Sequence, residues 1–367
     1  MIRISKRNSI SFGKSALIRG IAIFLSLIAT AIVILAIVGL NPIDVYVSMA
    51  KGTFGDPFNL FGKRFQYFLR DMMILTCIAI GLAPAFKMRF WNVGAEGQML
   101  VGAIGAMFFM RNFAGKMPDV LLFVCMIAAA LLLGGIWGLI PGFFKAKWNT
   151  NETLFTLMMN YIAIRFTAYC VAKWENPFGS NTVGIVNSDT KTGWIGNLLS
   201  KGYNGDYLWT VLIVLALCTA MWAYLRYSKQ GYEIAVVGES ENTARYAGIN
   251  VRRVTVRTML ISGAICGLCG FLIVAGKDQT ISTASANGRG FTAIIVAWLA
   301  KFNTFYMALI SFLLVFLERG ASEIASAYSL NEYAADIITG IILFFILGSE
   351  FFINYRVIPR GAHKEGK

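Results

Sequence analysis

Long uncharged runs alternate with short charged segments along most of the chain. An α-helix needs about 20 apolar residues to cross the hydrocarbon core of a membrane. Four runs reach about that length without a charge: 21–40, 120–144, 207–225 and 258–276. Four more can span if a charge or charged flanking residues are accepted, since long basic side chains snorkel to the interface: 72–86, 153–172, 302–317 and 333–352. The pattern predicts an all-α membrane protein.

Two further apolar runs are too short for an ordinary span. They cover residues 98–110 and 290–300, and each lies next to a polar, glycine-containing stretch. About ten transmembrane segments result, of which the third and eighth are expected to be short or interrupted rather than full-length helices.

Composition and charge agree with this interpretation. Hydrophobic residues make up 57% of the chain, charged residues 14%, and the mean hydropathy is +0.64, so most of the chain is expected to face lipid. The net charge of +14 would suggest nucleic acid in a soluble protein, but here the basic residues lie between apolar runs. Placing the N-terminus inside puts 20 Lys and Arg on the cytoplasmic side and 12 outside, which predicts two cytoplasmic termini.

These spans divide one transmembrane domain, residues 1–367, into predicted parts. Small residues spaced by four, such as Gly134 and Gly138 or Gly263 and Gly267, predict close helix packing. The six cysteines lie in apolar runs and are expected to be buried without a disulfide framework. The parts outside the spans are a cytoplasmic N-terminal segment 1–20, external loops 41–70 and 172–206, and a cytoplasmic loop 226–257.

Polar residues beside the two short runs are candidates for chemistry. Asn92, Glu96 and Gln98 precede or open the first run, and Asn287 to Phe291 precede the second. Backbone leaves helical form inside a membrane only where it is buried in protein or lines water, and paired interrupted segments point to a transporter's central pathway. The two halves, 69–171 and 254–353, would then form an inverted repeat. The alternative is that both breaks are ordinary loops whose glycines serve turns.

A second polar cluster opens the span near residue 153. Asn151 is a candidate helix cap, and Glu152 favours the positive end of the helix dipole. Asn160 is an amide within the span, so it must either bond a neighbouring helix or contact substrate. Arg165 either snorkels outward or lines a wet face.

The longest predicted cytoplasmic loop contains a short helix. Ser240 and Asn242 are typical helix caps, and Gly248 with Asn250 is typical of a helix end. Such a surface helix suits docking to a soluble partner, whereas the alternative is a solvated connector held near anionic lipid by its arginines.

Four ordered stretches resemble one known family. They are 90–106 (FWNVGAEGQMLVGAIGA), 151–163 (NETLFTLMMNYIA), 231–251 (GYEIAVVGESENTARYAGINV) and 290–304 (GFTAIIVAWLAKFNT). The chain resembles the permease subunits of bacterial ABC importers for nucleosides and simple sugars, which are similar to branched-chain amino acid permeases. It departs from that pattern at Trp91, where relatives commonly carry a smaller residue.

The resemblance implies a type II-like importer permease in the bacterial inner membrane. Two permease subunits, the second a sister chain, would enclose the path, and an external substrate-binding protein would deliver the solute. ATP and Mg would be bound by separate ATPase subunits, and no cofactor by this chain: Gly13-Lys14-Ser15 ends like a phosphate loop, but Asn8 stands where its first glycine is required. The loop helix at 239–248 would be the coupling helix. Residues implied in coupling to the ATPase are Glu233, Glu239, Arg245, Tyr246 and Gly248.

A neutral, hydrogen-bonding solute needs amides, hydroxyls and aromatic faces. Such groups suit nucleosides and ribose alike, and the family resemblance favours nucleosides. A secondary transporter using Glu96 or Asp336 as proton carrier is the alternative function. An enzyme is disfavoured because the one histidine, His363, lies in the polar tail. The predicted pathway residues are Asn92, Glu96, Gln98, Asn160, Tyr161, Phe291 and Trp298.

Overall fold

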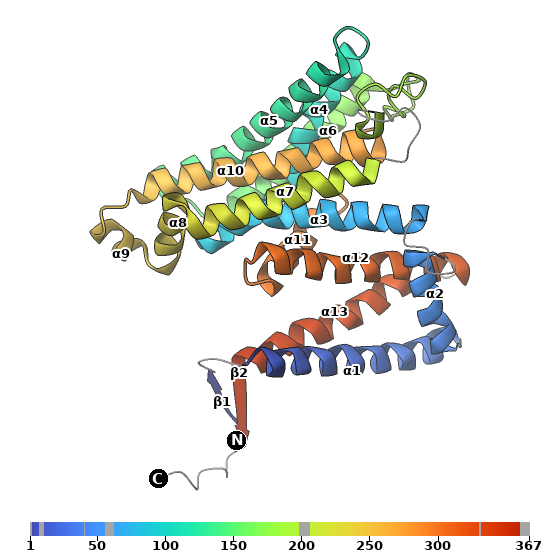
Figure 1. Cartoon of the computed structure of the whole chain (residues 1–367), viewed down its shortest axis with the longest axis vertical. Helices are drawn as coiled ribbons and strands as arrows, with labels where there is room; N and C mark the ends of the chain where they lie inside the picture. The colour runs from blue at the N-terminus through green and yellow to red at the C-terminus, as the bar shows by residue number, and fades with distance from the viewer. Residues whose placement is uncertain are drawn as a thin grey trace. The chain divides into compact units, whose positions relative to one another are not determined.

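The computed structural model describes residues 2–6, 11–39, 41–55, 62–197, 206–329 and 332–359, and it is 80% helical. Figure 1 shows the course of the chain. Its elements are β1 (Ile2–Lys6), α1 (Phe12–Val38), α2 (Pro42–Phe54), α3 (Lys63–Lys87), α4 (Ala95–Phe113), α5 (Asp119–Trp148), α6 (Glu152–Trp174), η1 (Ile195–Asn197), α7 (Asp206–Tyr227), α8 (Lys229–Glu239), α9 (Glu241–Tyr246), α10 (Val251–Leu272), η2 (Ile273–Asp278), α11 (Arg289–Leu299), α12 (Thr304–Ala327), α13 (Glu332–Asn354) and β2 (Tyr355–Pro359).

The predicted all-α membrane fold is confirmed. Each of the ten apolar runs overlaps a helix over most of its described residues; Leu40, at the end of the first run, lies outside them. Within the part of the chain that the structure describes, seven helices are long and apolar enough to cross a membrane, and α11 and α13 add shorter apolar stretches. The short pair of strands was not predicted: β1 and β2 pair antiparallel, with Ile2 opposite Pro359.

The two short runs differ from each other. α11 has 11 residues, about 16 Å, and is short as expected. α4 has 19 residues, about 28 Å, because the helix begins at Ala95 and includes polar residues that the apolar run left out. Glu96 and Gln98 are buried at this end of the helix, so both polar side chains face protein.

The described residues form two compact units. The terminal unit contains residues 1–68 and 313–367, and the central unit contains residues 69–312. In the terminal unit, α1 lies beside α13 (Figure 1), and Arg19 of α1 pairs with Glu350 of α13 at 2.5 Å. This ion pair accounts for the acidic residue near the end of the predicted span, since charges within membrane helices are usually paired.

Glycines hold α4, α5 and α10 together in the central unit (Figure 1). A Cβ added to Gly134 of α5 would lie 2.5 Å from Gly267 Cα of α10, and a Cβ on Gly267 would lie 2.9 Å from Gly134 Cα. A Cβ on Gly102 of α4 would also collide with Gly267. The predicted close packing at four-residue spacing is therefore present at the centre of the bundle.

The predicted loops are more regular than their sequences suggested. Residues 41–70 are not a simple loop, because α2 and the start of α3 occupy most of them. The stretch 172–206 is largely irregular apart from η1, and residues 198–205 of it lie outside those described. Residues 226–257 contain the end of α7, α8, α9 and the first turns of α10. α9 lies where the short helix was predicted. The segment 1–20 includes β1 and the start of α1.

Candidate functional site

Asn92 ties the coil before α4 to two neighbouring elements. Its Nδ2 donates to Gln98 Oε1 (3.3 Å) and to Ser262 Oγ of α10 (3.1 Å). Its Oδ1 accepts from the Gly94 N–H (3.0 Å) and from Gln98 Nε2 (3.2 Å). Both amides are buried, and they satisfy each other. In this conformation the two residues fix the coil and do not line an open path.

Asn160 of α6 fixes the same coil from the other side. Its Oδ1 accepts from the Gly97 N–H (2.9 Å) and its Nδ2 donates to the Val93 carbonyl (2.8 Å). Of the two roles the sequence left open, the structure shows hydrogen bonding to a neighbouring segment. Tyr161, the next residue, is exposed. Glu152 at the start of α6 pairs with Lys145 of α5 at 2.9 Å.

The two interrupted segments meet at Glu96 and Gly290. The Glu96 side chain packs against Gly290 in the first turn of α11, so its carboxylate lies near the N-terminus of that helix, where a helix dipole favours negative charge. A Cβ on Gly290 would lie 2.9 Å from the Glu96 backbone nitrogen. Glycine is thus required for the approach, which brings the first turns of α4 and α11 into contact.

The same two segments meet a second time through aromatic rings. Trp91, in the coil before α4, stacks on Trp298 near the end of α11, with ring centroids 5.2 Å apart. Phe291 is also exposed. Of the predicted pathway residues, Tyr161, Phe291 and Trp298 are therefore exposed, whereas the four polar ones are buried.

A polar segment that leads into α11 was not among the predicted pathway residues. α10 continues into the π-helical η2, a form common at functional sites, and an irregular stretch follows. Ser282, Thr283 and Asn287 are exposed there. Arg289 is buried, and its Nη1 has no hydrogen-bond partner among the described residues. The run of Ser, Thr and Asn between two spans was the sequence signal for it.

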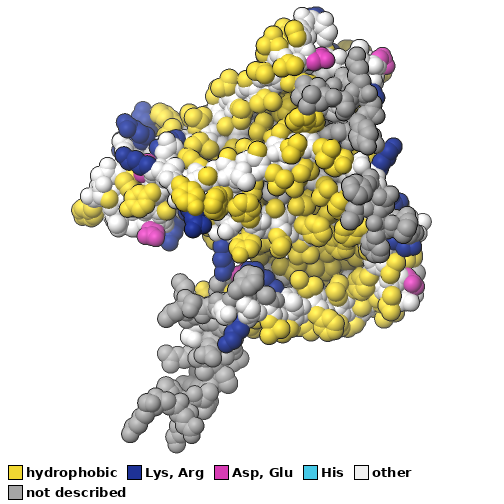
Figure 2. All heavy atoms as spheres, viewed as in Figure 1, with side chains coloured by type: hydrophobic (Ala, Val, Ile, Leu, Met, Phe, Trp, Pro, Cys, Tyr) yellow, Lys and Arg dark blue, Asp and Glu magenta, His cyan; other side chains and the backbone are white. Residues whose placement is uncertain are grey.

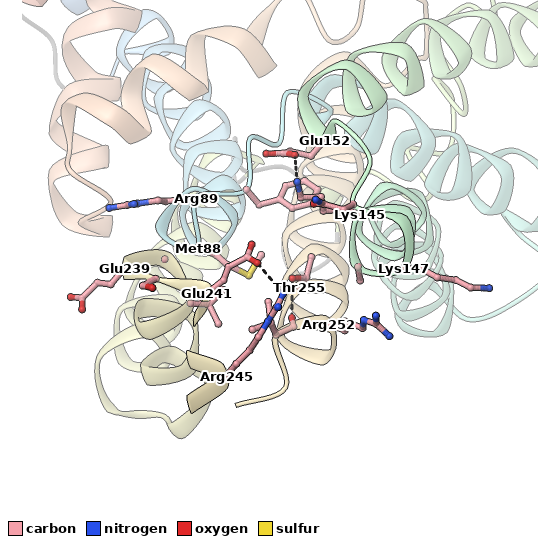
Figure 3. Close-up of a pocket in the computed structure, with 17 residues that line it drawn as sticks. Met88, Arg89, Lys145, Lys147, Glu152, Glu239, Glu241, Arg245, Arg252 and Thr255 are labelled. Atoms are coloured by element: carbon pink, nitrogen blue, oxygen red, sulfur yellow. Dashed lines mark hydrogen bonds and ion pairs between the residues drawn. The ribbon is translucent and has the colours of Figure 1, made fainter. Parts of the chain in front are cut away.

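A second site lies at the end of the central unit that carries α8 and α9. Dark-blue Lys and Arg side chains gather at this end in Figure 2. A cavity of about 360 Å³ opens between α8–α9, the start of α10, the end of α3 and the α5–α6 turn (Figure 3). Its charged lining residues are Arg89, Lys145, Lys147, Glu152, Glu239, Glu241, Arg245 and Arg252.

Basic groups outnumber acidic ones in this cavity. Figure 3 shows Lys145 directed at Glu152 and Arg245 joined to Glu241, the latter pair at 3.4 Å. Arg89, Lys147 and Arg252 make no ion pair with another described residue. The arrangement offers three positive charges to an acidic surface.

Four of the five predicted docking residues line the cavity or lie on the α9 turn, and the fifth, Glu233, does not. Glu239 and Arg245 line the cavity. Tyr246 is 93% exposed at the end of α9, and Gly248 ends the α9 turn with a φ of +77°, a conformation that favours glycine. Glu233 differs, because it pairs with Arg257 of α10 at 3.0 Å within the chain. It therefore holds α8 in place instead of being presented on the surface.

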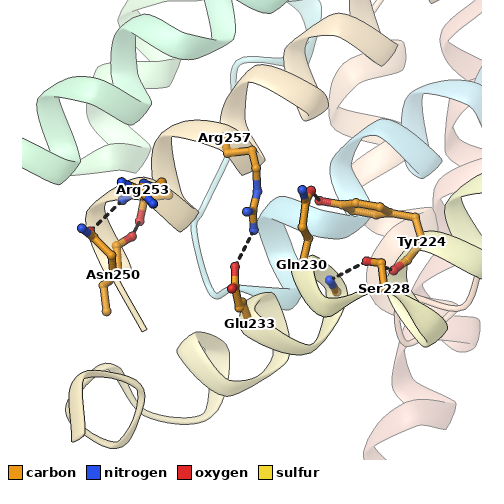
Figure 4. Close-up of polar contacts among 10 residues, drawn as sticks. Tyr224, Ser228, Gln230, Glu233, Asn250, Arg253 and Arg257 are labelled. Carbon is orange, nitrogen blue, oxygen red and sulfur yellow. Dashed lines mark hydrogen bonds and ion pairs between the residues drawn. The ribbon is translucent and has the colours of Figure 1, made fainter. Parts of the chain in front are cut away.

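Further contacts fix α8 between α7 and α10 (Figure 4). Tyr224 Oη lies 3.0 Å from Gln230 Oε1, to which it donates. Ser228 Oγ accepts from the Gly231 N–H at 2.9 Å and caps α8. Beside them, the Glu233–Arg257 ion pair joins α8 to the helix that also bonds Asn92. The exposed α9 therefore directly follows α8, a helix that defined contacts hold against α7 and α10.

Comparisons with known proteins agree on one family. A model described as the permease component of a branched-chain amino acid transport system matches residues 64–347. The chain is 31% identical to the guanosine ABC transporter permease protein NupP of Bacillus subtilis, over 94% of this chain and 97% of that protein. It is 29% identical to the glucose ABC transporter permease protein TsgB13 of Haloferax volcanii, over 92% and 89%. It is 27% identical to the nucleoside ABC transporter permease protein NupB of Lactococcus lactis, over 91% of each. The chain therefore belongs to the family of branched-chain amino acid transport system permease components, the transmembrane subunits of ABC transporters.

Proposed function

We propose that this chain is the permease subunit of an ATP-binding-cassette importer that carries nucleosides or related simple sugars into the cell. The family supports a transport subunit, and relatives named for guanosine, nucleoside and glucose transport support this range of solutes. The meeting of two interrupted segments at Glu96 and Gly290 is the observation that carries the proposal, because such segments form the central site of transporters.

Energy for transport comes, in this proposal, from separate ATPase subunits that bind ATP and Mg. The exposed α9 and the basic cavity beside it form the docking site, and α8 passes movement of the ATPase to α10. A second permease subunit completes the path: relatives of this chain include both NupP and NupQ of Bacillus subtilis. An extracytoplasmic binding protein supplies the solute. The chain lies in the bacterial inner membrane with both termini in the cytoplasm.

Charge reversal at Arg245 tests this assignment. Arg245→Glu places two glutamates at i and i+4 on α9 and lowers the positive charge of the cavity. ATP-driven nucleoside uptake by the assembled complex is expected to fall strongly, while the amount of permease in the membrane stays constant. Lys116→Glu is the matched control, because Lys116 is exposed on the predicted external side. Equal uptake by both variants would contradict docking at α9.

A further inference from the structure

Four aromatic rings form one cluster where the two interrupted segments meet for the second time. Phe86 at the end of α3 touches Trp91 edge-on (centroids 6.0 Å apart, planes at 84°) and Trp298 (6.1 Å, 61°). Phe302 packs against Trp298 at 5.3 Å and stacks on Phe86 at 6.3 Å. The two indoles stack on each other with their planes 24° apart. The rings therefore support one another in defined orientations.

One part of this aromatic cluster is buried in the protein, and another part is exposed. Phe86 is buried, whereas Trp91 and Trp298 keep 45% and 46% of their surface exposed. A large aromatic surface is thus held rigidly and left uncovered by this chain. Such surfaces usually have a ligand, a partner or lipid in contact with them.

The position of α11 favours a water-filled path over lipid. α11 is too short to span the membrane, and it follows the irregular polar stretch with exposed Ser282, Thr283 and Asn287. Irregular backbone at membrane depth occurs only where it is buried in protein or lines a cavity. Phe291 and Trp298, seven residues apart, lie on one face of α11 and are both exposed. That face follows the polar stretch directly along the chain, which is the reason for assigning both to one path.

The backbones on both sides of the pair are fixed. On one side, Thr156 Oγ1 of α6 accepts from the Val93 N–H at 3.2 Å, and Asn92, next to Trp91, is bonded to α10. On the other side, α11 is held at its N-terminus by Glu96. A stacking surface with little freedom loses little entropy when a flat ligand binds.

We propose that the Trp91–Trp298 pair is the stacking site for the base of a nucleoside and makes the path selective for nucleosides over simple sugars. Every nucleobase has a π face, and stacking on an aromatic side chain favours binding by roughly 5- to 150-fold per base. A simple sugar has no such ring. The inference rests on the proposed importer function and narrows its substrate class.

Four variants test the proposal in the complete importer, reconstituted in vesicles with saturated binding protein so that the rate reports the permease step. Trp91→Leu and Trp298→Leu keep apolar bulk but remove the π face, whereas Trp91→Phe and Trp298→Phe keep it. Initial ATP-driven uptake of guanosine and of ribose is measured for each. Phe344→Leu is the control, because Phe344 is an aromatic residue that is also exposed, at 73%, but it belongs to α13 in the terminal unit.

The expected result is a fall in guanosine uptake of roughly 5- to 150-fold in the leucine variants. The phenylalanine variants and Phe344→Leu should stay close to the unmodified complex, and ribose uptake should not change in any variant. Guanosine uptake retained by the leucine variants would overturn the stacking site and indicate a lipid anchor. A phenylalanine variant that loses uptake as fully as its leucine counterpart would overturn it too. An unmodified complex that imports ribose but no nucleoside would overturn the selectivity while leaving the importer function standing, and no ATP-driven uptake of either solute would refute the proposed function itself.

Discussion

Replacing Gly290 by alanine perturbs the contact on which the proposed path depends. A Cβ at this position would collide with Glu96 Cγ and lie 2.9 Å from the Glu96 backbone nitrogen. Ordinary contacts of this kind begin at 3.4 Å, so the first turns of α4 and α11 would have to separate by about 0.5 Å. Glu96 cannot yield alone, because its backbone nitrogen belongs to α4.

The cost follows from two effects. Overpacking of a tight contact costs about 1–3 kcal/mol. Moving the Glu96 carboxylate away from the N-terminus of α11 removes a further ~0.3–1 kcal/mol of helix-dipole stabilisation. Because about 1.4 kcal/mol corresponds to a factor of ten, the arrangement in which the two segments touch should become roughly tenfold or more less populated.

The assay is ATP-driven nucleoside uptake by the reconstituted importer, together with the thermal midpoint of the purified complex. Gly290→Ala should lower the uptake rate by about tenfold or more. Gly340→Ala is the matched control, since a Cβ at this glycine of α13 meets nothing within 4 Å. The reasoning is refuted if Gly290→Ala transports as fast as Gly340→Ala.

Three further substitutions have defined outcomes. Asn160→Leu leaves two backbone groups without partners, one in the coil before α4 and one in the first turn of α4, at about 1–3 kcal/mol each; the thermal midpoint of the complex should fall, and an unchanged midpoint would contradict these bonds. Arg257→Gln breaks the partly buried ion pair with Glu233, which contributes about 1–2 kcal/mol, a value between those of exposed and of buried ion pairs. The amount of solute imported per ATP hydrolysed should fall. An unchanged amount would argue against transmission through α8. Gly267→Ala forces a Cβ against Gly134 and should reduce the amount of folded protein far more than Gly348→Ala, which has open space; equal yields would show that the helices can separate without loss.

The spans could be predicted because a membrane imposes its thickness on every crossing helix. α2 was missed for the same reason: Pro42–Phe54 has 13 residues and contains Asp44 and Lys51. It is therefore neither long nor apolar enough to be recognised as a membrane span. The β1–β2 pair joins the two ends of the chain, and nothing local in a five-residue strand specifies so distant a partner.

The sequence identified polar candidates, but only the structure could assign their partners. Asn160 was recognised as an amide within a span, yet its partners, in the coil before α4 and in the first turn of α4, lie more than 60 residues away. Glu233 was expected at the docking surface, and its pairing with Arg257 depends on how α8 folds back on α10. The sequence paired the two interrupted segments, but it gave no sign that Trp91 stacks on Trp298.

The most direct measurement of the central claim is nucleoside uptake into vesicles that contain both permease subunits, the ATPase subunits, the binding protein and an ionophore that collapses all ion gradients. The proposed importer predicts that nucleoside accumulates as long as ATP is supplied to the ATPase side, and that ATP withdrawal stops it. Uptake that disappears with the ion gradients while ATP is still hydrolysed would contradict the claim and favour a secondary transporter.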